Sequence, residues 1–246
     1  MSASAAFDEN SAPSGNYRGF NTRTTEVVTF LRDANCCVRR QNAPKLVYVF
    51  IPKLLNMLDL QPRLIGDTLK LIPLQAEHWS SLMQAASDPL IWVLHPEPMR
   101  YLPEVFQTVF ASGLSSGGAF LICDKLTDEV LGTTRYYDFD AKNKAVAIGY
   151  TFLVRSRWGG STNTELKQLM LKHAFAAVDT VWFHVGENNI RSRRAVEKLG
   201  ATYQKTAQES AAGQVRPTVF YALFKADWLR QCALSNTQSR GVIQNR

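Results

Sequence analysis

From about residue 67, the spacing of apolar residues alternates between the period of strands and that of helices. Residues 68–74 predict a strand, and residues 77–86 predict a helix. A second helix is predicted over residues 101–112, where apolar side chains recur on one face. The apolar positions of that face are Val105, Phe106, Val109 and Phe110. Two helices are therefore expected after the first strand.

The middle of the chain predicts a three-stranded meander. Two strands, over residues 118–123 and 130–137, are joined by a turn-like sequence at residues 125–128, which favours an antiparallel pair. Residues 145–154 make the third strand. A helix with apolar residues at helical spacing follows, and a strand over residues 181–185 comes directly after it. This last stretch is a β-α-β unit.

The last third of the chain adds a short helix and two strands. The helix covers residues 189–199 and ends at Gly200, a common glycine stop. Strands are expected near residues 202–206 and 217–224. The order of elements predicts an α+β domain of three α/β layers, in which helices flank a mixed, mostly antiparallel central sheet.

The two ends of the chain lack this pattern. Residues 1–44 are rich in Ser, Asn, Thr and Arg, which indicates a flexible extension. The apolar run at residues 46–51 stops at Pro52, well short of the roughly 20 residues that span a bilayer, so no membrane partner is expected. Met57 precedes the patterned part, so an upstream start is a second explanation of the extension. The expected division is an extension at 1–56, a domain at 57–230 and a C-terminal tail at 231–246.

Composition describes a globular protein with a sizeable core. Of the 246 residues, 46% are hydrophobic and 11% are aromatic. The net charge of +7 is compatible with acidic ligands such as nucleotides, and also with a solvated basic surface. Charge alone is the sole argument for a nucleic-acid partner, so that partner is not expected.

The cysteines argue against a metal site and a secretory framework. The chain contains no CxxC pair and no histidines at zinc-ligand spacing. Adjacent cysteines do not easily bond to each other, and no apolar signal segment is visible. Reduced thiols in a cytoplasmic protein are therefore favoured. The four cysteines are Cys36, Cys37, Cys123 and Cys232.

A basic glycine turn, residues 157–163, joins the strand at 145–154 to the next helix. The first amides of a helix lack intrahelical partners, and adjacent Gly159 and Gly160 allow the backbone to approach a phosphate. The turn matches neither familiar phosphate loop, since it has no Gly-Lys-Ser/Thr ending and no third glycine. On the turn alone, an ordinary glycine turn with solvated arginines is an equal alternative.

Three segments in a definite order carry a family resemblance. They are Ile148-Gly149-Tyr150, Trp158-Gly159-Gly160, and Asn189-Ile190-Arg191-Ser192 followed by Glu197-Lys198-Leu199-Gly200-Ala201. On these segments the chain, from about residue 59 to 225, resembles the GCN5-related N-acetyltransferase (GNAT) superfamily, in particular the branch of ribosomal-protein N-terminal acetyltransferases. The resemblance implies a fold of the acyl-CoA N-acyltransferase type, with acetyl-CoA as acetyl donor and no metal.

The resemblance also implies where acetyl-CoA binds. The strand before the glycine turn would run beside the pantetheine arm, amides at the helix start would hold the pyrophosphate, and the segment from Asn189 would meet the pantetheine and the sulfur. The implied cofactor-binding residues are Phe152, Leu153, Val154, Arg157, Trp158, Gly159, Gly160, Ser161, Thr162, Asn163, Asn189 and Ser192.

The catalytic groups are less well defined. By resemblance, Ser192 would give a proton to the departing CoA thiolate, although serine is also favourable in a first helical turn. Many relatives place a glutamate base where this chain has Ala147, and others place a tyrosine acid where it has Val196. Three residues near strand ends are candidate bases, and water is a further proton acceptor. The candidates are His184, Glu187 and Asp138.

Both strand-end candidates in the last third also have ordinary roles, because His184 can be a core or surface histidine and Glu187 can cap the helix that begins near Asn189. Acceptor residues are expected between the two early helices, although a plain proline-rich connection is an equal alternative. Tyr136 and Tyr137 are expected to add an aromatic wall, with one of the two facing the core. The acceptor candidates are His95, Glu97, Arg100, Tyr101 and Tyr136.

These observations predict an acetyl-CoA-dependent N-acetyltransferase. Its acceptor would be a primary amine, at a protein N-terminus or on a small molecule, that attacks the thioester directly. The missing glutamate and tyrosine leave a second hypothesis open, a CoA-binding regulatory or interaction module without turnover. The oligomeric state is left open.

Overall fold

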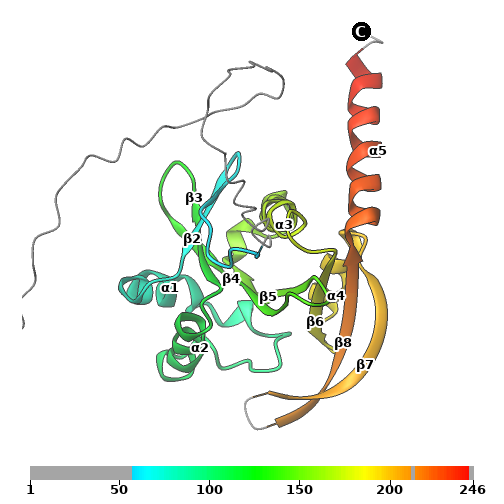
Figure 1. Ribbon diagram of the computed structural model, residues 1–246. Coiled ribbons are helices and arrows are strands. Elements are labelled where there is room, and N and C mark those ends of the chain that lie inside the picture. Colours follow the sequence, from blue (N-terminus) through cyan, green and yellow to red (C-terminus); the bar gives the residue numbers. More distant parts are fainter. Residues whose placement is uncertain (1–56, 212–213, 244–246) are drawn as a thin grey trace, which may run out of the picture. The chain divides into compact units, whose positions relative to one another are not determined.

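The computed structural model describes residues 57–211 and 214–243. The predicted extension at residues 1–56 lies outside these residues, as do Cys36 and Cys37. The domain boundaries stay a prediction. Within the described residues, one sheet and its flanking helices form the architecture (Figure 1).

Eight strands of the described part form one sheet in the order β1-β2-β3-β4-β5-β6-β8-β7. Every neighbouring pair is antiparallel except β5 and β6, which are parallel, so the predicted mixed and mostly antiparallel sheet is confirmed. The strands are β1 Leu64–Ile65, β2 Leu69–Pro73, β3 Ala119–Asp124, β4 Val130–Asp140, β5 Ala145–Leu153, β6 Thr180–Gly186, β7 Thr202–Ala211 and β8 Gln214–Phe224.

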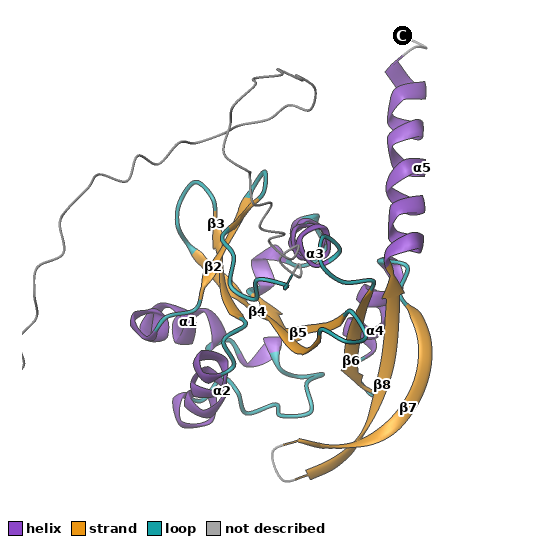
Figure 2. Ribbon diagram, viewed as in Figure 1, coloured by secondary structure: helices purple, strands orange, loops and turns teal. Residues whose placement is uncertain are grey.

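Helices cover both faces of the sheet, with α1 and α2 on one face and α3 on the other (Figures 1 and 2). The α-helices are α1 Trp79–Ala86, α2 Pro103–Ser115, α3 Thr162–Ala174, α4 Ile190–Lys198 and α5 Lys225–Ile243. Short 3-10 turns lie at Ala76–His78, Pro89–Ile91 and Arg155–Arg157.

The alternation of side chains along the strands divides the core into two clusters. Ile148 and Phe183 face α3 and pack with Met170 of that helix. On the opposite face, Phe152 packs with Phe106 of α2, their ring centroids 6.0 Å apart. Each face of the sheet therefore packs against its own apolar cluster, and the sheet lies between the two clusters.

The parallel pair β5 and β6 is joined along only part of its length. Ladder pairs run from Ala145 with Thr180 to Ala147 with Trp182, and no pair joins the two strands beyond that point. β6 continues along β8 to Gly186, whereas β5 continues along β4 to Leu153. The carboxyl ends of these parallel strands thus leave an unpaired strand edge, the position at which open α/β sheets place ligands.

Among the described strands and α-helices, one strand and one helix have no counterpart in the prediction. β1 is only two residues long, and α5 extends from the last strand into the predicted tail. Near its start, the ring of Trp228 packs against Phe175, with centroids 5.2 Å apart. The predicted tail thus includes part of a helix.

Candidate active site

A β-bulge interrupts the pairing of β5 with β4, beyond the last residue at which β5 pairs with β6. The register passes from Thr133 opposite Phe152 to Arg135 opposite Gly149, so Thr134 faces two residues, Tyr150 and Thr151. Tyr150 has a φ of 51°, which is rare for a residue with a side chain. A bulge leaves one residue outside the regular ladder, so a backbone group here is free for a ligand.

Three side chains support the bulge on the α3 side. The Thr151 hydroxyl lies 2.8 Å from the Thr134 hydroxyl and accepts a 2.8 Å hydrogen bond from Lys167 Nζ. Lys167 is only 5% exposed, and burial lowers the pKa of its amine to about 7. The sequence pattern alone does not identify Lys167 as a site residue. The one hint in the sequence is that Lys167 lies within one helical turn of two apolar, core-facing residues, Leu166 and Met170.

The glycine turn leads from β5 into α3 and is open to solvent. Gly159 has a φ of 74°, and a Cβ added at Gly159 or Gly160 would meet nothing within 4 Å. The N-cap Ser161 makes no side-chain cap hydrogen bond, so the first amides of α3 keep their donors free. This end of α3 has the donors, the dipole and the space that a pyrophosphate requires.

The arginines of the turn have carboxylate partners within the protein. Arg157 Nη2 donates to Asp124 Oδ2 at 2.8 Å, and Arg155 pairs with Asp88. Arg157 therefore ties the turn to the end of β3. The contact of Arg157 with the cofactor stays a prediction, and its guanidinium is held by Asp124.

The glycine turn and the start of α4 meet. The Arg191 guanidinium lies 4.0 Å from the centre of the Trp158 ring, and the Trp158 indole donates to the Leu153 carbonyl at 2.8 Å. Arg191 Nη2 also donates to the Ile91 carbonyl at 2.9 Å. Two segments that are far apart in sequence and that carry the family resemblance are thus in contact.

Asn189 caps α4 and orients its first turn. Its side-chain oxygen accepts a 3.2 Å hydrogen bond from the Ser192 amide, and Asn189 is buried. The Ser192 side chain is half-buried, and its hydroxyl makes no hydrogen bond within the described part of the chain. The hydroxyl is therefore free to donate to a ligand. The suggestion that Glu187 caps this helix is wrong, because Asn189 does so.

Of the three candidate bases, His184 has the most distinctive environment. Its ring lies between Tyr137, at 5.5 Å, and Phe220, at 4.5 Å. Burial lowers its pKa below the usual value of 6.5, so the imidazole is neutral at neutral pH. Glu187 and Asp138 are exposed.

Tyrosines line the sheet face that carries α1 and α2. Tyr150 is 48% exposed and packs edge-on against Tyr137, at 5.1 Å, which in turn meets His184. We call Tyr150, Tyr137 and His184 the aromatic row. A Cβ on Gly149 would lie 2.9 Å from the Tyr137 ring, so glycine lets this ring lie close to β5.

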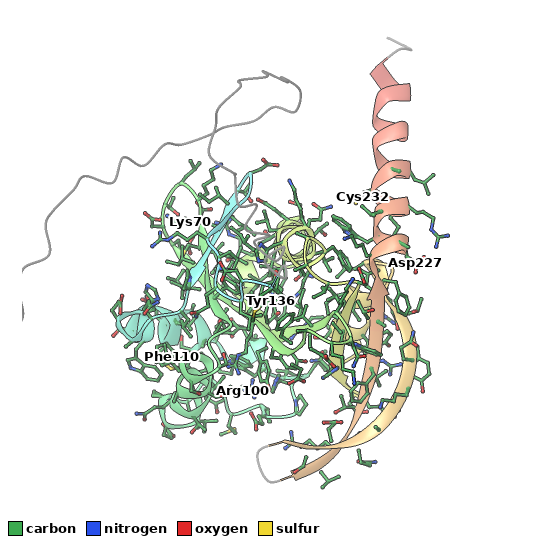
Figure 3. All side chains as sticks on the ribbon, in the orientation of Figure 1. Lys70, Arg100, Phe110, Tyr136, Asp227 and Cys232 are labelled. Carbon is green, nitrogen blue, oxygen red and sulfur yellow. The ribbon has the colours of Figure 1, made fainter. Side chains whose placement is uncertain are left out.

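The prediction that Tyr136 contacts the acceptor is wrong. Tyr136 lies in the middle of the domain, surrounded by other side chains (Figure 3). It is 0% exposed, and its hydroxyl donates to the Met170 carbonyl at 2.6 Å. Neighbouring residues on a strand face opposite sides, so Tyr136 joins the core beneath α3 while Tyr137 joins the aromatic row. Tyr150, which is not among the predicted acceptor residues, lies on the same face of the sheet as Tyr137.

The loop between the two early helices brings three acceptor candidates together. His95 Nδ1 accepts from the Glu97 amide at 2.9 Å, and Arg100 forms an ion pair with Glu97. Burial, followed by the charge of Arg100, lowers the pKa of His95 to about 4, so its ring is neutral. A Cβ on Gly186 would lie 2.9 Å from Pro96, which places this loop at the end of β6.

Tyr101, the remaining acceptor candidate, makes no hydrogen bond or ion pair to this cluster among the described residues. Its hydroxyl contacts the sulfur of Met99 at 3.8 Å, and the residue is half-buried. Of the predicted acceptor residues, the structure therefore groups His95, Glu97 and Arg100 and leaves Tyr101 at their side.

No three or more His, Cys, Asp or Glu side chains gather closely enough to hold a metal ion within residues 57–211 and 214–243. Over the same residues, no helix is long and apolar enough to cross a membrane. Cys123 and Cys232 are both free thiols.

Solved structures share this fold. A GCN5-related N-acetyltransferase from Brucella melitensis matches with a TM-score of 0.60 and 20% identity, over 68% of this chain and 80% of that chain. RimJ from Mycobacterium smegmatis, in complex with CoA-disulfide, matches with a TM-score of 0.53 and 16% identity, over 68% and 87%. RimL, a ribosomal L7/L12 alpha-N-protein acetyltransferase in complex with coenzyme A, matches with a TM-score of 0.53 and 18% identity, over 68% and 99%.

The family follows from a comparison with sequence models of protein families. A comparison with curated proteins found no match. The model of the acetyltransferase (GNAT) domain matches residues 68–202, which is more than half of the chain and spans the bulge, the glycine turn and α4. The chain therefore belongs to the GNAT family of acetyl-CoA-dependent N-acetyltransferases.

Proposed function

We propose that this chain transfers the acetyl group of acetyl-CoA to a primary amine at the bulge of β5. The observation that carries the proposal is the continuity of three features: an unpaired strand edge with a bulge, an open glycine turn, and a helix start without a side-chain cap. Acetyl-CoA supplies an activated thioester when bound. The residues of the chain then bind acetyl-CoA and the amine, orient them, and exchange protons with them.

The donor side of the site consists largely of backbone groups. The first amides of α3 and the glycine turn bind the pyrophosphate, and residues 152–154 of β5 run along the pantetheine arm. A backbone amide at the bulge donates to the oxygen that becomes negative when the amine attacks. Ser192, whose hydroxyl has no partner among the described residues, protonates the departing thiolate.

His184 accepts the proton of the attacking amine. Its neutral imidazole belongs to the aromatic row, on the side of the sheet where the acceptor loop lies. A base must be unprotonated at the working pH, and burial keeps His184 so. Glu187 and Asp138 remain weaker candidates because they are exposed, and water is the acceptor if no side chain serves.

The acceptor class proposed first is a protein N-terminus. The RimJ and RimL structures share the fold, and RimL acts on the alpha-amine of a ribosomal protein. The loop of His95, Glu97 and Arg100 lies at the end of β6, where an extended peptide would approach the bulge. Small amines are the second class.

Release of free CoA thiol from the full chain tests the proposal. Acetyl-CoA is supplied with a panel of N-terminal peptides, polyamines and amino acids. We expect thiol release with at least one peptide and an increase in melting temperature with acetyl-CoA alone. Tight CoA binding without thiol release across the panel would contradict turnover and favour the regulatory module.

A further inference from the structure

Arg135 is a buried arginine on the acceptor side of the sheet. It extends from β4 toward α2 and is only 6% exposed. Its guanidinium carbon lies 4.1 Å from the centre of the Tyr150 ring. On the α2 side, a Cβ on Gly113 would lie 3.3 Å from Arg135 Nη2 and 3.0 Å from Leu74, so glycine leaves room for the guanidinium.

The charge of Arg135 has no carboxylate partner among the described residues. Its Nε has no hydrogen-bond partner there, and Nη1 donates a long 3.3 Å bond to the Ser112 hydroxyl. Burial lowers the pKa of Arg135, which reflects the unfavourable loss of water around the cation. A buried cation without an anion is costly, and a methionine would fill the same space at lower cost.

A small cavity adjoins this guanidinium. Its volume is about 10 Å³, room for one water molecule or one oxygen atom of a ligand. Arg135, Thr133 and Tyr150 form part of its wall. The rest consists of one glycine and of apolar side chains from α1, from α2 and from the residues before α1. Those residues are Leu74, Leu82, Phe106, Val109, Phe110 and Gly113.

The cavity lies next to the reacting position. Arg135 pairs across the ladder with Gly149, the residue immediately before the bulge. Tyr150, which covers the guanidinium, is itself part of the bulge and is half exposed to solvent. Arg135 lies on the strand next to the bulge. A group that binds Arg135 would therefore be close to the position where the amine attacks.

The surrounding charges favour an anion as well. The charges of Arg100 and Arg216 act on His95, so both guanidinium groups lie near the acceptor loop. Glu97 is the carboxylate of this loop, and Arg100 holds it in an ion pair. Arg100 also acts on Arg135. The guanidinium groups thus lie around the acceptor loop, whereas the carboxylates of Asp138 and Glu209 act on His184 in the aromatic row.

We propose that Arg135 binds a carboxylate of the acceptor, so that the preferred acceptor carries a carboxylate close to its primary amine. The planar guanidinium matches a carboxylate through two parallel hydrogen bonds, and Nε supplies one of the donors. The cavity beside Arg135 has room for one carboxylate oxygen, and the half-exposed Tyr150 ring in its wall would have to shift to make room for the second. The proposal rests on the proposed acetyl transfer and names the class of its acceptor.

Two sources can supply this carboxylate, and matched acceptors distinguish them. One pair of N-terminal peptides differs only in glutamate or glutamine at the second position. The other pair is a free amino acid and its amide. For the wild-type full chain, we expect kcat/KM to be about tenfold or more higher for the acidic member of one pair, in line with the loss when a buried charged group is left unpaired.

Variants separate binding of a carboxylate from support of the fold. Arg135→Met should bring the acid-to-amide ratio of kcat/KM close to one, and Arg135→Lys should give an intermediate ratio because it keeps the charge but loses the fork. If Arg135 only supported the fold, its substitution would lower kcat/KM for both members of a pair by the same factor. Arg63→Met removes an exposed positive charge ahead of β1 and should keep the wild-type ratio.

The outcomes are distinguishable from failure of the proposed function. Transfer at equal rates to the acid and amide members of both pairs overturns the carboxylate site and leaves acetyl transfer intact. If no acceptor releases thiol, calorimetry with the CoA-loaded protein and the same peptides decides: tighter binding of the acidic peptide, lost in Arg135→Met or Arg135→Lys, supports the site, and equal binding overturns it. If Arg135→Met does not fold, Arg135→Lys and the wild-type ratios carry the test.

Discussion

Lys167 Nζ donates a 2.8 Å hydrogen bond to the Thr151 hydroxyl, inside the domain and beneath the bulge of β5. The lysine amine is buried and its pKa is lowered to about 7, whereas the ordinary value is 10.5. A buried base thus supports the backbone conformation that the proposed reaction uses. The arrangement has a measurable cost, because a protonated lysine prefers water.

This cost predicts that stability rises with pH. Between about pH 7 and 10.5 the unfolded chain keeps the Lys167 proton and the folded chain releases it, so the free energy of unfolding should increase across this window. Lys167→Met should remove that increase and be more stable at pH 7 by on the order of 1 kcal/mol or more. Urea denaturation of both proteins at pH 6.5, 8 and 9.5 measures the difference; parallel pH profiles would contradict it.

Ser192→Ala should lower kcat without lowering stability. The alanine keeps the backbone amide that Asn189 accepts from, so α4 retains its cap. If the hydroxyl protonates the thiolate, kcat should fall about a hundredfold and the melting temperature should stay within error. A kcat equal to that of the wild type assigns Ser192 to the helix turn alone.

Unlike Ser192→Ala, Asn189→Ala should lower the stability of the protein. Loss of the cap at α4 should cost about 1 kcal/mol in the free energy of unfolding. Because Asn189 is buried at the proposed pantetheine site, KM for acetyl-CoA should also rise. Chemical denaturation and steady-state kinetics on the same preparation test both effects, with Ser192→Ala as the reference variant.

The two adjacent glycines of the turn form a matched pair. Gly159 has a positive φ, so Gly159→Ala should destabilise the turn by about 1 kcal/mol. The φ of Gly160 lies outside the left-handed region and its surroundings are open, so Gly160→Ala should leave the free energy of unfolding unchanged. An increase in KM for acetyl-CoA in Gly160→Ala then reports close approach of the pyrophosphate, and an unchanged KM places the phosphates elsewhere.

The lowered pKa of His184 leads to a prediction for the pH dependence of the reaction. Its pKa is lowered, so the unprotonated base persists below pH 6.5, and kcat/KM should fall only when the pH drops through that lower value. His184→Gln should lower kcat/KM about a hundredfold and remove this acid limb. A profile with the same acid limb in the variant would assign the proton to water or to another group.

Most of the fold is predictable from the sequence because strand and helix periods are distinct. The helix over residues 77–86 and the strand over residues 181–185 are confirmed, their ends lying within a few residues of those observed. α5 is absent from the predicted elements because its apolar residues, such as Trp228 and Leu234, do not recur along a single face.

The site is less predictable because it depends on contacts between strands. Tyr136 and Tyr137 are neighbours in sequence, and only the register of β4 decides which one reaches the acceptor side. The bulge, which turns Tyr150 outward, leaves no signature in the spacing of apolar residues. Arg135 looks like one polar residue in a half-polar strand until its burial between α2 and Tyr150 is seen.

The contact of Arg191 with Trp158 has a thermodynamic consequence for the order of binding. A single guanidinium stacks on the glycine turn and also holds the Ile91 carbonyl, just before the acceptor loop. A donor molecule that immobilises the turn therefore also restrains Arg191 and the start of that loop. An acceptor that binds next has less conformational entropy to lose, so donor and acceptor should each tighten the binding of the other by the same factor.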